Sequence, residues 1–361
     1  MIPNSSFKYF MAGALLVSLC GCGGSQRPNN AAASSNGTVP SSVTPVSGYA
    51  VSVFAGASQF GSSTHPDSLI KVGSNIFVGY GDAVNPDGTV AGSNPPTAGK
   101  CEIIEYDLTG KPLKTFTITG HNDGLLAYDS QTIWAMSNED ANPTLTVINL
   151  ANATQTQYTP TTPLLHGGGL DDMSLINGKV FVSASNPSLS PSNTPNGASA
   201  VISISLNANG HTFDWTPVLS NTAPATDVAS GSAITLNLTD PDSEAVDPSG
   251  NLVLDSQGDS ELVILSNPGS ANQTASRLSL TLYTNPWPVD DTRFVPTGTN
   301  PFMLFTDTKA NTIYRVDALF NAGDVYSAGE GTLLKLDPTS GNLTPIIDGL
   351  TSPHGILFIT K

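Results

Sequence analysis

The 361-residue sequence has few cysteines and lacks several well-known catalytic and metal-binding motifs. Only three cysteines are present, and two of them, Cys20 and Cys22, lie close to the N-terminus. No Cys-x-x-Cys, His-Glu-x-x-His or Gly-x-Ser-x-Gly occurs. The sequence therefore does not indicate a multiply disulfide-bonded domain, a paired-cysteine zinc site, a zinc protease of the His-Glu type or an α/β serine hydrolase.

Basic side chains are also scarce: 13 Lys and Arg stand against 29 Asp and Glu, and the formal net charge is −16. Loss of segment 1–21, which contains Lys8 and no acidic residue, takes that charge to −17. This balance argues against a nucleic-acid partner, which needs a basic footprint. The acidic surplus favours a cationic ligand or a metal ion, although solubility alone accounts for most of these charges.

The apolar run at the N-terminus is too short to span a membrane. It covers Tyr9–Leu19, whereas a spanning helix needs about 20 apolar residues. The run ends in Cys20-Gly21-Cys22-Gly23-Gly24, which resembles the lipobox of bacterial lipoproteins. The alternatives are an ordinary secretory signal cut near Gly23, and lipidation at Cys20 instead of Cys22.

The lipobox resemblance implies a signal peptide over residues 1–21 and lipidation of Cys22. It also implies a protein of the bacterial cell envelope, attached to the outer membrane through its N-terminal lipid, and it leaves Cys101 without a disulfide partner. Residues 22–48 are expected to form a flexible linker, since Ser25–Ser47 is almost wholly Asn, Ala, Ser, Pro, Thr and Gly. We expect one folded domain over residues 49–361, as a monomer.

The rest of the chain shows no long amphipathic helix pattern and instead alternates short apolar runs with turns. The clearest unit is Pro241–Leu262, in which two polar turns separate three short strands. Six segments repeat a polar turn followed by a short apolar strand: His65–Ile70, His121–Leu126, Gly169–Ser174, Asp240–Ala245, Pro288–Arg293 and Ser352–Leu357. Their spacing fits the four-stranded blades of a β-propeller, and fits a β-sandwich or a β-helix poorly.

The strand count predicts six blades and leaves seven open. In the fifth unit, Phe302–Phe305 and Thr312–Val316 are expected to be the second and third strands. Asp324–Ala328 and Thr332–Leu336 are then additional strands, from which a seventh blade can be built. The chain stops at the first strand of the sixth unit, which Tyr49–Phe54 is expected to complete from the other end of the domain. The predicted fold is all-β, a six-bladed β-propeller after a signal peptide and a disordered tether.

The central unit also resembles an NHL repeat, through Pro241, Ala245-Val246-Asp247, Gly250-Asn251-Leu252, Asp255-Ser256 and Gly258. The domain is thereby similar to the superfamily of six-bladed propellers of the NHL, SMP-30 and TolB-like kind, whose members have unrelated functions. The Glu-Gly-Pro metal ligand of SMP-30-like lactonases has no match here. Pro353-His354-Gly355 matches, once, the blade starts of streptogramin-lyase-like propellers.

In a propeller the first strand of each blade lines the central channel, so the six repeated turns place their polar residues on one rim. The predicted rim consists of His65, Asp67, His121, Asp123, His166, Asp171, Asp242, Glu244, Asp290 and His354. We expect His65, His121, His166 and His354 to hold a divalent metal on the axis, the only cofactor indicated. The alternative is that these side chains only cap tight turns.

Two functions follow from this rim. The first is a binding module for a protein or a small molecule, through the channel mouth or the loops Asp82–Thr97, Asn186–Ser199 and Ser220–Ser232. The second is a metal-dependent hydrolase or lyase, of the lactonase, esterase or streptogramin-lyase kind, with metal-activated water or a His general base. The sequence leaves both open, so whether the protein is an enzyme is undecided at this stage.

Overall fold

The computed structural model of the protein describes residues 36–189 and 194–360. Cys22 and the expected signal peptide lie outside these residues. Strands dominate the described part, and its helices are two single 3-10 turns, η1 (Ala57–Gln59) and η2 (Gln257–Asp259). No helix in the described part is long and apolar enough to cross a membrane.

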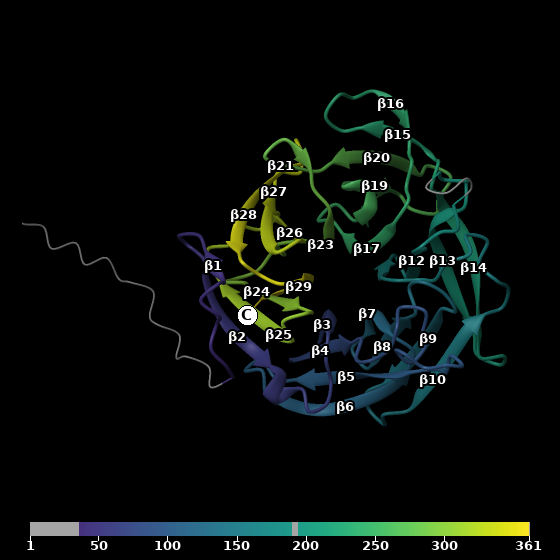
Figure 1. The fold of residues 1–361 in the computed structure, drawn as a ribbon. Helices are drawn as coiled ribbons and strands as arrows, with labels where there is room; N and C mark the ends of the chain where they lie inside the picture. The colour runs from purple at the N-terminus through teal and green to yellow at the C-terminus, as the bar shows by residue number, and fades with distance from the viewer. Residues whose placement is uncertain (1–35, 190–193, 361) are drawn as a thin grey trace, which may run out of the picture. The chain divides into compact units, whose positions relative to one another are not determined.

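Each of the first four blades is built from four consecutive antiparallel strands, with the first strand innermost (Figure 1). Blade 1 contains β3 (Pro66–Val72), β4 (Asn75–Tyr80), β5 (Lys100–Tyr106) and β6 (Pro112–Thr119). Blade 2 contains β7 (Asn122–Asp129), β8 (Thr132–Ser137), β9 (Thr144–Asn149) and β10 (Gln155–Pro160). Blade 3 contains β11 (Met173–Ile176), β12 (Lys179–Ser183), β13 (Ser199–Asn207) and β14 (Thr212–Ser220). Blade 4 contains β17 (Pro241–Val246), β18 (Leu252–Ser256), β19 (Glu261–Ser266) and β20 (Thr274–Ser279).

The last two blades interleave their strands along the chain. Blade 5 contains β23 (Val289–Phe294), β26 (Val325–Gly329), β27 (Thr332–Leu336) and β28 (Asn342–Asp348). Blade 6 contains β29 (Pro353–Ile359), β24 (Phe302–Asp307), β25 (Thr312–Asp317) and β2 (Ala50–Gly56). The assignment of residues 302–305 and 312–316 to the fifth unit is therefore wrong, because β24 pairs with β29. The two supposedly additional strands complete blade 5, so the propeller has six blades.

The N-terminal end of the domain closes the ring. As predicted, β2 pairs with β25 and forms the outer strand of blade 6. Part of the expected linker also contacts the propeller: β1 (Thr44–Pro45) pairs with β28, and Val43 is buried between blades 5 and 6. The Asn36 side chain donates hydrogen bonds to two carbonyl oxygens, of Phe54 at 2.6 Å and Thr109 at 2.7 Å. Composition did not reveal these contacts because they consist of a two-residue backbone pairing and of single side chains.

Six apolar clusters fill the six contacts between neighbouring blades. The second strand of a blade, such as β24 in blade 6, is buried along its whole length because neighbouring blades cover both of its faces. Its sequence is therefore a continuous apolar run, Phe302–Phe305, rather than an alternating one. The three tryptophans, Trp134, Trp215 and Trp287, join clusters between blades.

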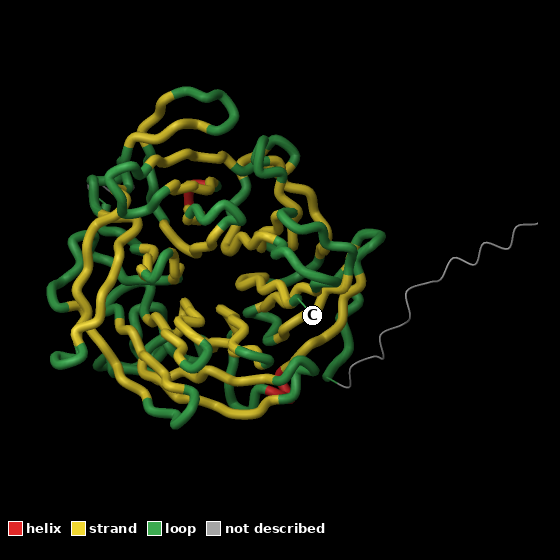
Figure 2. The backbone as a smooth tube through the Cα atoms, turned by 180° about the vertical axis from the view of Figure 1, so that it is seen from behind, coloured by secondary structure: helices red, strands yellow, loops and turns green. Residues whose placement is uncertain are grey.

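Short additional strands cover blade edges. The hairpin of β15 (Pro224–Asp227) and β16 (Ala233–Thr235) extends blade 4 and projects from the ring (Figure 1). The hairpin of β21 (Thr281–Leu282) and β22 (Asn285–Pro286) extends blade 5. A parallel pair, β10 with β14, joins blades 2 and 3. Seen from behind, the strands surround the centre and loops connect their ends (Figure 2). These pairings leave few unpaired strand edges.

Candidate functional site

The inner strands of five blades begin with the same irregularity, a shift in pairing with the second strand. Such a bulge bends a strand and redirects the side chains within it. The bulges contain Asp67 in β3, Asp123 in β7, Asp242 in β17, Asp290 in β23 and His354 in β29. All five line one cavity where the inner strands begin, so five of the six turns repeated in the sequence correspond to one repeated structural feature.

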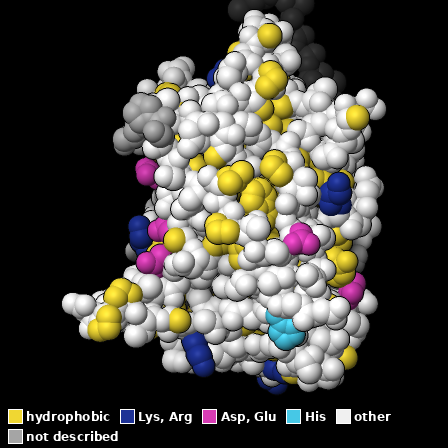
Figure 3. All heavy atoms as spheres, turned by 90° about the vertical axis from the view of Figure 1, so that its right-hand side faces the viewer, with side chains coloured by type: hydrophobic (Ala, Val, Ile, Leu, Met, Phe, Trp, Pro, Cys, Tyr) yellow, Lys and Arg dark blue, Asp and Glu magenta, His cyan; other side chains and the backbone are white. Residues whose placement is uncertain are grey.

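This cavity has a volume of about 840 Å³ and is strongly acidic. The basic residues in its lining are Arg293, Lys309 and His354. Its carboxylates belong to Asp67, Asp123, Glu139, Asp140, Asp171, Asp172, Asp240, Asp242, Asp290, Asp291 and Glu330. One flank of the molecule shows only a few separated acidic side chains (Figure 3). Of the 29 Asp and Glu residues, 11 line the cavity, and their negative charge attracts cations.

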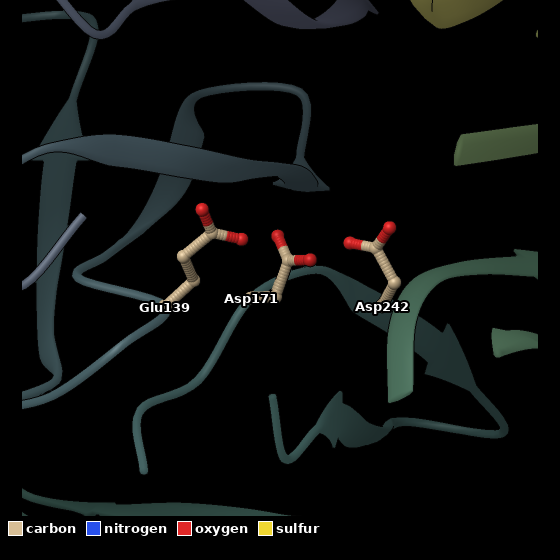
Figure 4. Close-up of side chains that lie close together, drawn as sticks. All are labelled: Glu139, Asp171 and Asp242. Atoms are coloured by element: carbon tan, nitrogen blue, oxygen red, sulfur yellow. The ribbon is translucent and has the colours of Figure 1, made fainter. Parts of the chain in front are cut away.

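Three of these carboxylates meet: Glu139, Asp171 and Asp242 each offer an oxygen within 4.8 Å of the other two (Figure 4). They come from the turn after β8, the segment before β11, and β17, and therefore from three blades. Within the described chain, no backbone N–H and no basic side chain donates a hydrogen bond to any of the three. Burial, with the neighbouring carboxylates, raises the pKa of Glu139 and Asp242 well above the usual range. Burial likewise raises the pKa of Asp171 to about 7.

Three carboxyl groups this close cannot all be ionised without a positive charge between them, because their negative charges repel. The group is therefore stable either when its members share protons or when they surround a cation. Oxygen ligands of this kind suit Ca²⁺, Mg²⁺ or Mn²⁺. Among the residues that the structure describes, this is the one group of three or more His, Cys, Asp and Glu side chains with ligand atoms so close together, and it contains no His. Sequence reasoning missed Glu139 because it follows β8, whereas the repeated turns precede inner strands. The acidic pair Glu139-Asp140, separated from that strand by one residue, was the available signal.

Of the four histidines predicted to hold a metal, only His354 lines the cavity. Its Nδ1 lies 3.3 Å from Asp290 Oδ1 and 3.5 Å from Asp67 Oδ1. Burial alone would lower its pKa, but the two carboxylates outweigh burial and raise the pKa to about 10. At neutral pH the ring is therefore an imidazolium, which has no lone pair for a metal. His65 is exposed, and its Nδ1 donates to the Asp82 carbonyl oxygen at 3.0 Å.

The other two histidines are bonded to backbone carbonyls beside the cavity. His121 Nδ1 donates to the Val84 carbonyl oxygen at 2.7 Å, and its Nε2 lies 3.3 Å from Asp123 Oδ1. His166 is buried, and its Nε2 donates to the Gly169 carbonyl oxygen at 2.8 Å. Burial lowers the pKa of His166, so this ring is neutral at pH 7. The structure thus does not bring the four predicted ligands together.

A charged network stands next to the carboxylate group. Arg293 pairs through Nη2 with Asp172 Oδ2 at 3.0 Å, and through Nη1 with Asp291 Oδ1 at 2.9 Å. It also donates to the Glu244 carbonyl oxygen. The Glu244 carboxyl group, predicted on the rim, does not line the cavity and is 2% exposed. Burial raises the pKa of Glu244 well above the usual range and thus favours its protonated form.

No protein-family model matches the sequence, and no curated protein matches it. Similar solved structures include virginiamycin B lyase from Staphylococcus aureus, at TM-score 0.48 and 11% identity, covering 86% of this chain and 96% of that one. A streptogramin B lyase has TM-score 0.45 and 12% identity, with coverage of 85% and 90%. The periplasmic gluconolactonase PpgL of Pseudomonas aeruginosa has TM-score 0.44 and 10% identity, with coverage of 82% and 88%.

At this identity and similarity, these likenesses assign neither a family nor an activity. The strand pairing establishes a β-propeller, whereas the narrower resemblance to NHL and TolB-like repeats stays a prediction.

Proposed function

We propose that the cavity binds a divalent cation through Glu139, Asp171 and Asp242, and that the propeller is a binding module for a ligand held with that cation. The observation that carries this proposal is the meeting of three carboxylates from three blades, with Asp171 buried and the other two half-buried, and without a basic partner in the described part of the chain. Oxygen ligands favour Ca²⁺, Mg²⁺ or Mn²⁺ over zinc. Because these ions take about six to eight ligands, three carboxylates leave positions for water or for ligand oxygen atoms.

Titration of the chelator-treated protein with Mn²⁺, Ca²⁺ and Mg²⁺ tests this proposal. We expect one stoichiometric site, and we expect Asp242→Asn or Glu139→Gln to weaken binding by roughly two orders of magnitude, because each removes a charged ligand. Asp129→Asn, an exposed change at the far end of β7, is the matched control and should bind normally. A wild-type protein that binds none of the three ions stoichiometrically contradicts the proposal.

We further propose that the protein is a monomeric lipoprotein of the bacterial cell envelope, held at the outer membrane by a lipid on Cys22, with no nucleic-acid partner. The support is the lipobox-like sequence and the acidic composition. Mass spectrometry of the mature N-terminus checks the lipid: a chain that starts elsewhere than at a modified Cys22 rules it out.

A metal-dependent hydrolase or lyase is the second candidate, and the state of His354 favours it. This imidazolium shares the cavity with the carboxylate group, and Asp67 and Asp290 hold its proton. Its Nε2 also lies 3.1 Å from Ser352 Oγ. A charged imidazole of this kind donates a proton to a leaving group as a general acid. A cation bound in the same cavity would supply polarisation of a carbonyl oxygen or activation of water.

For this candidate we expect the metal-loaded wild-type protein to cleave at least one member of a lactone and ester panel. His354→Gln should lower that rate about 100- to 10,000-fold, the usual contribution of a general acid, and leave Mn²⁺ binding unchanged. Steady-state kinetics with both proteins measures the effect. No turnover by the wild type, or equal turnover by the variant, removes the enzymatic candidate and leaves the binding module.

A further inference from the structure

Glu139 differs from the other two members of the carboxylate group because it lies in a turn after a second strand. Hydrogen bonds on both sides of this residue hold its backbone. Its N–H donates to Asp123 Oδ2 at 3.2 Å, and its carbonyl oxygen accepts from the Gly169 N–H at 3.0 Å. Because a side chain starts from its backbone, these two bonds set where the Glu139 carboxylate reaches.

The first bond leads to His121. Asp123 Oδ2 accepts from the N–H groups of Asn138 at 2.8 Å and of Glu139, while its Oδ1 faces His121 Nε2 at 3.3 Å. The other ring nitrogen, Nδ1, donates to the Val84 carbonyl oxygen at 2.7 Å, which fixes the ring beside the Asp123 carboxyl group. The Asp123 side chain is 4% exposed. The His121 ring therefore lies against, and confines, the carboxyl group that accepts from the Glu139 N–H.

The second bond leads to His166. This residue is 1% exposed, and its Nε2 donates to the Gly169 carbonyl oxygen at 2.8 Å. The Gly169 backbone packs closely against the carbonyl groups of Asn138 and Glu139. A Cβ added to Gly169 would lie 2.0 Å from the Asn138 carbonyl oxygen and 2.5 Å from the Glu139 carbonyl oxygen. A glycine is required for so close a backbone approach. His166 thus holds the loop that supports Glu139 from its other side.

We propose that His121 and His166 are positioning residues, which fix the Glu139 backbone from its two sides and so place its carboxylate for the cation. This inference rests on the proposed cation site and explains why two histidines lie near it without ligating. Outer partners of metal ligands orient the ligands, and their loss typically lowers metal affinity 10- to 100-fold. Here the two histidines would orient a ligand in the same way, but they act on the backbone of Glu139 and do not contact its carboxylate.

The test compares variants that remove a ring donor with variants that retain an N–H donor. His121→Phe and His166→Phe should weaken Mn²⁺ binding about 10- to 100-fold. His121→Gln and His166→Gln should recover most of that loss, because the amide still donates. Hydrogen exchange of the amides at residues 138–140, measured without metal, should be faster in the Phe variants only. His65→Phe, at an exposed ring outside the cavity, is the control and should change neither readout.

The two readouts separate the two proposals. If the wild type binds no Mn²⁺, the cation site fails, and the hydrogen exchange alone then supports or overturns the positioning role. Phe variants that match the wild type in both readouts overturn that role, as do Gln variants as defective as Phe variants. Should a Phe variant not fold, Gly169→Ala replaces it, since its methyl displaces the same peptide. Gly56→Ala, with no neighbour closer than 3.4 Å, is then the control.

Discussion

Replacement of Arg293 by Met is expected to lower the free energy of unfolding by about 3–5 kcal/mol. Arg293 lies between Asp172 and Asp291, whose side chains are 6% and 2% exposed. Methionine fills much of the same space but carries no charge. Two buried carboxylates then lose their common counter-charge, which is the costly way to break a buried ion pair. Urea unfolding of the protein in chelator measures the change.

Lys335→Met is the matched control for this substitution. Lys335 pairs with Asp324 at 2.8 Å, but the two side chains are 40% and 23% exposed. An ion pair this accessible to water contributes at most about 1 kcal/mol. If Arg293→Met costs no more than Lys335→Met, the guanidinium does not hold the two buried carboxylates in the way that the geometry indicates.

The metal-free protein is expected to be more stable at pH 5.5 than at pH 8, by on the order of a few kcal/mol. Burial raises the pKa of Asp171, Asp290 and Asp291 to about 7 in the folded state. In the unfolded chain these groups titrate near the ordinary value of about 4. Between pH 4 and 7 the folded state therefore holds more protons, so its stability falls as the pH rises. Urea unfolding in chelator at the two pH values measures this.

Two histidines modify this dependence. The raised pKa of His354 also makes the free energy of unfolding fall with rising pH, because the stability that its protonation contributes is lost as the pH rises towards 10. The lowered pKa of His166 has the opposite effect, because it makes the folded protein less stable as the pH falls below about 6.5. This one group is outnumbered by the three carboxyl groups. Asp171→Asn should reduce the slope. Adding Mn²⁺ should stabilise the protein more at pH 8 than at pH 5.5, because protons compete with the cation. Metal-free stability that rises from pH 5.5 to pH 8 contradicts the prediction.

The fold was largely predictable because its signals are local. A turn followed by an apolar strand recurs six times. The second strand of a blade is buried between two neighbouring blades, which is why Phe302–Phe305 is continuously apolar. The same locality explains the error in blades 5 and 6. An apolar run shows that a strand is buried between neighbours, but it does not show which inner strand it joins. That choice depends on the pairing of β24 with β29, which are distant in sequence.

The site was predictable in part. The repeated turns led us to expect a shared rim, and six of its predicted members line one cavity: Asp67, Asp123, Asp171, Asp242, Asp290 and His354. Sequence reasoning expected histidine ligands, because four of the five histidines occur near these turns. It could not distinguish a ring that faces the cavity from one that bonds a backbone carbonyl, as in His166. His354 lies within β29 and His166 lies before β11, and neither position reveals in the sequence which way the ring points.

The sequence alone therefore predicts an all-β propeller whose repeated turns place acidic side chains near its centre. It can do so because the residues that form a turn, and the apolar residues of a buried strand, lie within short segments. Three-dimensional packing adds the number of blades, the meeting of Glu139 with Asp171 and Asp242, and the neutralisation of Asp172 by Arg293. The last of these joins residues 121 positions apart. Contacts of this kind depend on how the ring closes, and no short segment contains that information.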